Sequence, residues 1–121
     1  MTTRRKRVMP FKDRARAVLA MSLAAYALDV PLALVEDDRR GGPASFARQV
    51  AMYIANVVFG MSMSRVAGAF GRDRSTVAHA CKSVEERRED ERFDKWIGAL
   101  ERSAQEAPSP FKPSIEASAG A

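Results

Sequence analysis

A stripe of large apolar side chains in the middle of the chain constrains the fold more than any other feature. Its members fall at i, i+4, i+7, i+8 and i+11, and they are Phe46, Val50, Tyr53, Ile54 and Val57. This spacing is typical of an amphipathic α-helix that buries one face in a core. A Gly-Gly-Pro run precedes the stripe and Gly60 follows it, so the sequence predicts a core helix from about Ala44 to Phe59.

Shorter helical patterns, separated by capping and breaking residues, fill most of the remaining chain. Together the predicted helices cover about residues 13–28, 29–38, 44–59, 63–70, 74–88 and 94–105. Asp29, Ser62 and Asp73 are expected to cap the second, fourth and fifth of these helices. No segment alternates apolar and polar residues as a half-buried strand does. The predicted fold class is therefore all-α, a compact domain of about five to six helices.

Two inner faces can be assigned at the ends of this predicted domain. In the first helix the side chains expected to face the core are Val18, Leu19, Ser22, Ala25 and Tyr26. In the last helix Trp96, Ile97 and Leu100 form the apolar side, and Trp96 is expected to hold that helix against the core.

Three regions are predicted along the chain. Residues 1–11 form a flexible basic arm, residues 12–106 the helical domain, and residues 107–121, rich in Pro, Ser, Ala and Gly, a disordered tail. We interpret the basic run at 4–7 as a DNA-binding tail in preference to a solubilising arm. A basic run before an apolar segment also resembles a secretory signal. Charged residues at 12, 13, 14 and 16 interrupt that segment, so we favour a cytoplasmic, nucleoid-associated protein.

Charge is segregated along the chain, whose net charge is +5. Residues 1–16 carry seven basic groups and one acid, and residues 39–82 carry seven basic groups and one acid, Asp73. Residues 29–38 are acidic, and residues 85–106 carry more acids than bases. Such blocks favour a one-sided electrostatic footprint on nucleic acid, although chance clustering on a solvated surface gives the same pattern.

Several function classes find no support in the sequence. One cysteine, Cys81, and one histidine, His79, supply no metal site and no disulfide. The phosphate-loop pattern G-x-x-x-x-G-K-[ST] is absent, and so is a run of about 20 apolar residues that could span a membrane. Ser75, His79 and Asp73 follow one another along one helix, where they cannot form a nucleophile site. We expect no enzyme activity, no cofactor, no nucleotide and no membrane partner.

The segment from Ser62 to Val84 has the pattern of a helix-turn-helix. Gly71 breaks it into a short helix and a longer second helix. One face of the second helix is predicted to pack inward through Val77, Cys81 and Val84. The opposite face carries Ser75, His79 and Lys82, with Arg74 and Ala78 beside them. Hydroxyl, imidazole and cationic groups can meet base edges and phosphates in a major groove.

The start of the second helix adds to this pattern. Arg72 and Arg74 bracket Asp73, which can cap the helix or accept a hydrogen bond from cytosine. Free backbone N–H groups at a helix start favour phosphate oxygens. A plain helical hairpin with a polar face would look similar, so the pattern alone leaves that alternative open.

The same residues resemble the C-terminal DNA-binding domain of the bacterial replication initiator DnaA. The resemblance covers about residues 13–105 and is carried by ARQVAMYIA at 47–55, AFGRD at 69–73 and STVAHACK at 75–82. It implies an all-helical domain that reads a nine-base-pair site as a monomer. The family has two glycines where this chain has only Gly71, and histidine where it has Arg74. Arginine pairs best with guanine, so a different base preference is expected.

The resemblance also implies roles for individual residues. Arg40 matches an arginine that enters the minor groove, and Arg48 and Gln49 match positions beside the phosphate backbone. The start of the recognition helix, residues 73–75, matches positions that read bases. Thr76 and His79 match residues that contact the DNA backbone and groove, and Lys82 matches a nearby basic position. The full set of predicted DNA-binding residues is Arg39, Arg40, Arg48, Gln49, Ser62, Arg72, Asp73, Arg74, Ser75, Thr76, His79 and Lys82.

Two functions from different classes follow from the sequence. The favoured one is a sequence-specific binder of double-stranded DNA, either a transcriptional regulator or a modulator of replication initiation at initiator-like boxes. The alternative is a helical adaptor that binds a protein, with the basic arm serving only solubility. A second copy of the chain or another protein stays open as a further partner.

Overall fold

The computed structural model describes residues 11–37, 42–109, 111 and 113, and these residues fold into six helices without a strand. The helices are α1 (Phe11–Leu28), α2 (Leu32–Glu36), α3 (Gly42–Val57), α4 (Met63–Phe70), α5 (Arg74–Arg87) and α6 (Glu91–Glu106). The all-α prediction is confirmed. In the part of the chain that is described, no helix is both long and apolar enough to cross a bilayer.

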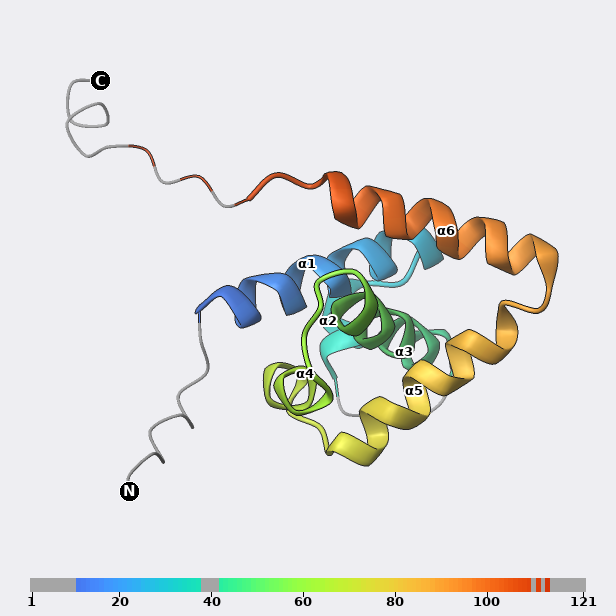
Figure 1. Ribbon diagram of the computed structural model, residues 1–121, viewed down its shortest axis with the longest axis horizontal. Coiled ribbons are helices and arrows are strands. Elements are labelled where there is room, and N and C mark those ends of the chain that lie inside the picture. Colours follow the sequence, from blue (N-terminus) through green and yellow to red (C-terminus); the bar gives the residue numbers. More distant parts are fainter. Residues whose placement is uncertain (1–10, 38–41, 110, 112, 114–121) are drawn as a thin grey trace.

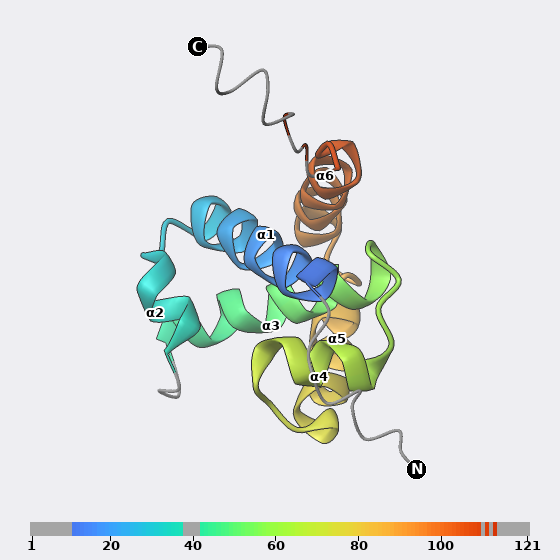
Figure 2. The same cartoon turned by 90° about the vertical axis from the view of Figure 1, so that its left-hand side faces the viewer.

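Helix α3 is the centre of the fold. It packs against α1 on one side and against α5 on the other (Figure 1), while α6 contacts α1 and crosses it at a large angle, as Figure 2 shows. The predicted stripe on α3 is largely confirmed, because Val50, Tyr53 and Ile54 are buried. Val57 is an exception: it is the last residue of α3, and 47% of it is exposed. The core helix therefore presents its apolar stripe to two neighbours at once.

The inner face predicted for α1 is confirmed at Ala25, which is buried, and wrong at Val18 and Tyr26. Ala17, Ala20, Met21 and Ala24 are buried, whereas Val18 is 38% and Tyr26 86% exposed. The distance between packed helices depends on the side chains at their contact. The alanines bring α1 close to α3, and the larger Val18 and Tyr26 lie outside that contact.

Asp29 ends α1 instead of capping α2. Its φ angle of 55° is left-handed, its amide donates to the carbonyl of Tyr26, and the amide of Val30 donates to the carbonyl of Ala25. This pair of bonds is a Schellman motif, which satisfies carbonyls at a helix end. The cap residue of α2 is Pro31, so the second helix begins later than predicted.

Aromatic rings and one arginine attach α6 and the end of α5 to the core. The ring of Phe93 lies 6.0 Å from that of Phe46 on α3 and 5.5 Å from that of Trp96 on α6 itself. Trp96 is partly buried and packs against the core, as predicted. Arg88 is the C-cap residue of α5. Its guanidinium donates to the hydroxyl of Tyr53 on α3 and to the carboxylates of Asp94 and Glu101 on α6. The C-terminal end of α5 is thereby fixed to both α3 and α6.

An ion pair between a buried aspartate and a half-exposed arginine joins the first turn of α1 to α4. Asp13 is 1% exposed, and its two carboxylate oxygens accept hydrogen bonds from Nε and Nη2 of Arg65 at 2.9 and 2.5 Å. Two parallel bonds between arginine and carboxylate are among the stronger polar contacts in proteins. These hydrogen bonds hold the pKa of the Asp13 carboxyl below its ordinary value of 3.8.

This lowered pKa predicts that the free energy of unfolding depends on pH in the acid range through Asp13. Because the pKa of Asp13 is lower in the folded than in the unfolded chain, the pair stabilises the fold above the unfolded-state pKa. That contribution is lost as the pH falls through the folded-state value. Replacing Asp13 with Asn should therefore flatten the curve of unfolding free energy against pH below about pH 5. Urea unfolding at a series of pH values measures this curve. Arg65→Gln, which removes the partner of Asp13, should flatten the curve as well. Parallel curves for the unmodified protein and both variants would contradict the assignment.

Candidate nucleic-acid interface

Helices α4 and α5 form the predicted hairpin, joined by residues 71–73. Gly71 has a φ angle of 66°, its amide donates to the carbonyl of Gly68, and the amide of Arg72 donates to the carbonyl of Ala67. The left-handed conformation favours glycine, which has no Cβ atom, and a Cβ built at this position would meet no other atom within 4 Å, so the backbone angle alone accounts for the glycine. One glycine is thus sufficient for the turn.

The two residues predicted to cap the helices of the hairpin, Ser62 and Asp73, differ in whether the side chain makes the capping hydrogen bond. The hydroxyl of Ser62 accepts a hydrogen bond from the amide of Arg65 at 3.2 Å, so Ser62 caps α4 as expected. Asp73 occupies the N-cap position of α5, and its backbone carbonyl accepts from the amides of Thr76 and Val77. The carboxylate of Asp73 makes no cap hydrogen bond. It remains exposed at the start of α5.

Helix α5 has one buried face and one exposed face, as predicted. The buried side chains are Val77, Ala80, Cys81 and Val84. The exposed ones near its start are Arg74, Ser75, Thr76, Ala78, His79 and Lys82. Figure 1 shows the N-terminal half of this helix at the edge of the molecule, away from α6. The polar face of α5 is therefore open to a partner.

This face has the charge expected of a surface that binds a polyanion. Arg74 and Lys82 form no ion pair with any residue in the described ranges. The amides in the first turn of α5 add partial positive charge at the same end. Asp73 supplies the single acid among residues 71–84. Side chains that donate and accept hydrogen bonds are thus presented together on one accessible helix.

Arg48 departs from the exposed position that its predicted role requires. It is 6% exposed, and its guanidinium donates to the carbonyls of Leu34, Val35 and Asp37. The last carbonyls of a short helix have no partners within the helix, and arginine can satisfy them. The structure thus places Arg48 inside the domain as the residue that holds the end of α2 against α3.

Arg72 joins the turn of the hairpin to α2. Its side chain is half-buried, and it donates to the carbonyls of Phe70 and Asp37 at 3.4 and 3.2 Å. Gln49, on the neighbouring helix α3, is also half-buried. Arg39 and Arg40 lie outside the described residues, so their predicted roles stay predictions.

Cys81 belongs to the core, as its position on the inner face predicts. Burial raises the pKa of its thiol to about 11, and its Sγ lies 4.0 Å from Oδ1 of Asn56. Within the residues that the structure describes, no three His, Cys, Asp or Glu side chains gather as metal ligands do.

Two polar contacts that position the hairpin were not anticipated from the sequence. The Asp13–Arg65 pair fixes α4 against α1, and the bonds of Arg88 fix the end of α5 against α3 and α6. Asp13 and Arg65 lie 52 residues apart and Tyr53 and Arg88 lie 35 apart, so neither contact has a recognisable sequence spacing. Asp13 is a charged residue within the predicted first turn of a packed helix, and this position is the only sequence signal that could have indicated the Asp13–Arg65 pair.

A compact all-helical core with an exposed polar helix after a tight turn defines a helix-turn-helix protein of the DNA-binding class. The match to the family described as bacterial dnaA protein helix-turn-helix covers residues 15–84. The chain therefore belongs to the family of the bacterial DnaA helix-turn-helix domain.

Relatives and solved structures agree with this assignment. The chromosomal replication initiator protein DnaA of Aquifex aeolicus (strain VF5) is 37% identical over 89 residues, which cover 69% of this chain and 22% of that protein. The DnaA protein of Laribacter hongkongensis (strain HLHK9) is 38% identical over 63 residues, covering 51% of this chain and 13% of that protein. The chain thus spans less than a quarter of the length of these relatives.

Two solved structures share the fold. One is described as the crystal structure of a DNA replication initiation factor, with a TM-score of 0.70 and 34% identity over 78% of this chain and 29% of that chain. The other is the replication initiator DnaA bound to AMPPCP and single-stranded DNA, with a TM-score of 0.69 and 33% identity over the same shares.

Proposed function

We propose that this chain binds double-stranded DNA in a sequence-specific manner and acts by occupying its sites, with no catalytic step. The observation that carries the proposal is the exposed polar face at the start of α5, in a family whose members are replication initiators. Its sites are initiator-like boxes or promoters on the bacterial chromosome, where it modulates replication initiation or regulates transcription.

The geometry supports reading in the major groove. After the turn at Gly71, α5 begins at the surface with its first residues exposed. The major groove of B-DNA is wide enough to admit an α-helix. Asp73, Arg74 and Ser75 lead that end and provide an acceptor, a two-pronged donor and a hydroxyl. These three groups can distinguish base edges, whereas Thr76, His79 and Lys82 lie further along the same face and suit phosphate contacts.

Enrichment from a library of random DNA duplexes tests the proposal. The full chain should select a short asymmetric site, and its affinity for that site should fall steeply with salt because each phosphate contact releases counterions. Footprinting on the selected duplex measures the extent of the site. Recovery of no preferred sequence, together with an affinity that does not depend on salt, would instead favour the protein adaptor.

A further inference from the structure

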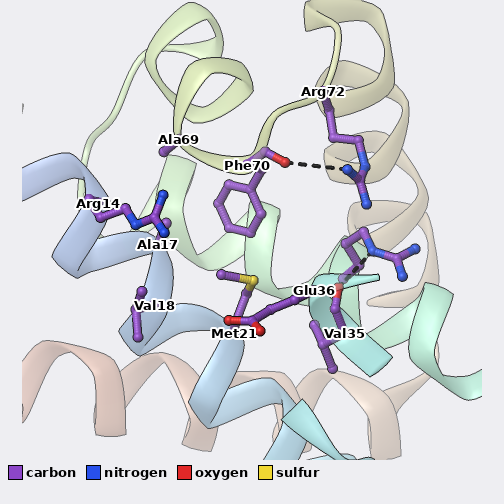
Figure 3. A pocket seen from close by; sticks show the side chains of 10 residues that line it. Arg14, Ala17, Val18, Met21, Val35, Glu36, Ala69, Phe70 and Arg72 are labelled. Carbon is purple, nitrogen blue, oxygen red and sulfur yellow. Dashed lines mark hydrogen bonds between the residues drawn. The ribbon is translucent and has the colours of Figure 1, made fainter. Parts of the chain in front are cut away.

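A hollow of about 310 Å³ lies on the surface between α1, α2 and the end of α4. Its charged lining consists of three arginines, Arg14, Arg48 and Arg72, and one acid, Glu36, while apolar side chains such as Met21 form the remainder. Figure 3 shows Arg14 and Arg72 on either side of the Phe70 ring. Because guanidinium groups outnumber carboxylates, the hollow favours an anion.

The hollow adjoins the hairpin that the proposed function assigns to DNA. Arg72 belongs to the turn itself and directly precedes Asp73, the cap residue of α5. Hydrogen bonds to the carbonyl of Asp37 fix both Arg72 and Arg48 in the wall of the hollow. A duplex engaged by the start of α5 therefore passes close to a surface on which two arginines are already positioned.

Arg14 is the exposed arginine of this lining. It forms no hydrogen bond or ion pair with any residue in the described ranges. Its neighbour Asp13 is turned inward and holds Arg65 with both oxygens. The charge of Arg14 is thus available to a ligand from outside, and the planar guanidinium fork matches the oxygens of a phosphate.

We propose that this hollow holds a phosphate group of the bound duplex, in the strand that flanks the groove entered by α5, with Arg14 as a direct ligand. The inference rests on the proposed DNA binding and extends the interface beyond the hairpin to the first turns of α1. The hollow has room for several water molecules, each of which occupies about 30 Å³ in the liquid. The phosphate accordingly keeps part of its hydration, and water bridges it to the deeper arginines.

Salt titration of DNA affinity tests the charge contact. Arg14→Gln should reduce the slope of log K against log [salt] by about 0.9, the value for one lost phosphate contact. The loss of affinity should be several-fold and equal for preferred and scrambled duplexes. Arg102 is also exposed but belongs to α6, which lies away from the start of α5 (Figure 1), so Arg102→Gln should leave the slope unchanged. Glu36→Gln should act in the opposite direction and raise affinity.

Neutral phosphate analogues locate the contact. Replacing single phosphates of the preferred duplex with methylphosphonates should reveal a flanking position that costs the unmodified protein several-fold in affinity and costs Arg14→Gln nothing further. Lys82→Gln should respond at a different phosphate. A wild-type slope for Arg14→Gln, while Lys82→Gln lowers it, would overturn this inference and leave the proposed function intact; failure of the unmodified protein to bind duplex would overturn both.

A free small anion is the competing occupant. Titrating inorganic phosphate into the DNA-free protein, with amide shifts of Ala17, Val35 and Phe70 followed by NMR, detects it. Saturable shifts that Arg14→Gln abolishes, combined with a wild-type salt slope for that variant, would show a small-anion site and contradict the duplex contact. Circular dichroism of each variant verifies that the fold is intact.

Discussion

Replacing Arg74 with alanine is expected to abolish the preference for guanine at one base pair of the selected site. Arg74 is the first residue of α5 and its side chain is exposed, so its fork can reach the O6 and N7 atoms of guanine. One such bidentate contact contributes about 1–3 kcal/mol of discrimination, or about 5- to 150-fold between bases. Competition binding against duplexes that vary one base pair at a time measures the change.

Two matched variants separate base reading from simple charge. Arg74→Lys keeps the charge but lacks the planar fork, so it should recover affinity without recovering the preference. Lys82→Ala should weaken binding to every sequence alike and lower the salt slope by about 0.9. If Arg74→Ala weakened all duplexes equally, Arg74 would be a phosphate contact and base reading would have to come from other residues.

Replacing Arg48 with methionine is expected to destabilise the domain in the absence of DNA by about 1–3 kcal/mol. Methionine keeps much of the apolar volume, but the carbonyl of Val35 loses its side-chain donor, while the carbonyls of Leu34 and Asp37 keep the amide of Asp37 and the guanidinium of Arg72 as donors. A buried acceptor left without a partner costs about 1–3 kcal/mol. Urea unfolding gives the free energy, and thermal unfolding should show a midpoint that falls by about 4–8 °C for each kcal/mol lost.

The same variant decides between two roles for Arg48. Arg48→Lys should recover only part of the stability, because a single ammonium group cannot reproduce the arginine fork across three carbonyls. Gln49→Ala, at the adjacent half-buried position, should change stability much less. If Arg48→Met unfolded like the unmodified protein but bound DNA more weakly, the phosphate contact implied by the family resemblance would hold.

The hairpin was predictable because local signals agree there. Ser62, Gly71 and Asp73 mark the ends of α4 and α5, and the spacing of Val77, Cys81 and Val84 defines the inner face of α5. Caps, breaks and periodicity are properties of short segments, so they can be read without knowing the rest of the fold.

Long-range packing accounts for what the sequence did not reveal. In α1, small and large residues alternate around the whole helix, and only contact with α3 determines that the alanine side is inside. Arg48 looks like any other arginine on an amphipathic helix until α2 folds back over it. Its inward orientation depends on carbonyls 11 to 14 residues away in the chain.

The exposed side chains that lead α5 make no contribution to the core, since the inner face and the bonds of Arg88 hold this helix in place. Changes at residues 74 and 75 therefore carry little cost in folding, whereas changes at Val77 or Val84 carry a large one. Under the proposed function, a lineage with this architecture is free to drift toward new target sites one base pair at a time. The sequence it prefers can then diverge from that of the initiators while the scaffold beneath it stays the same.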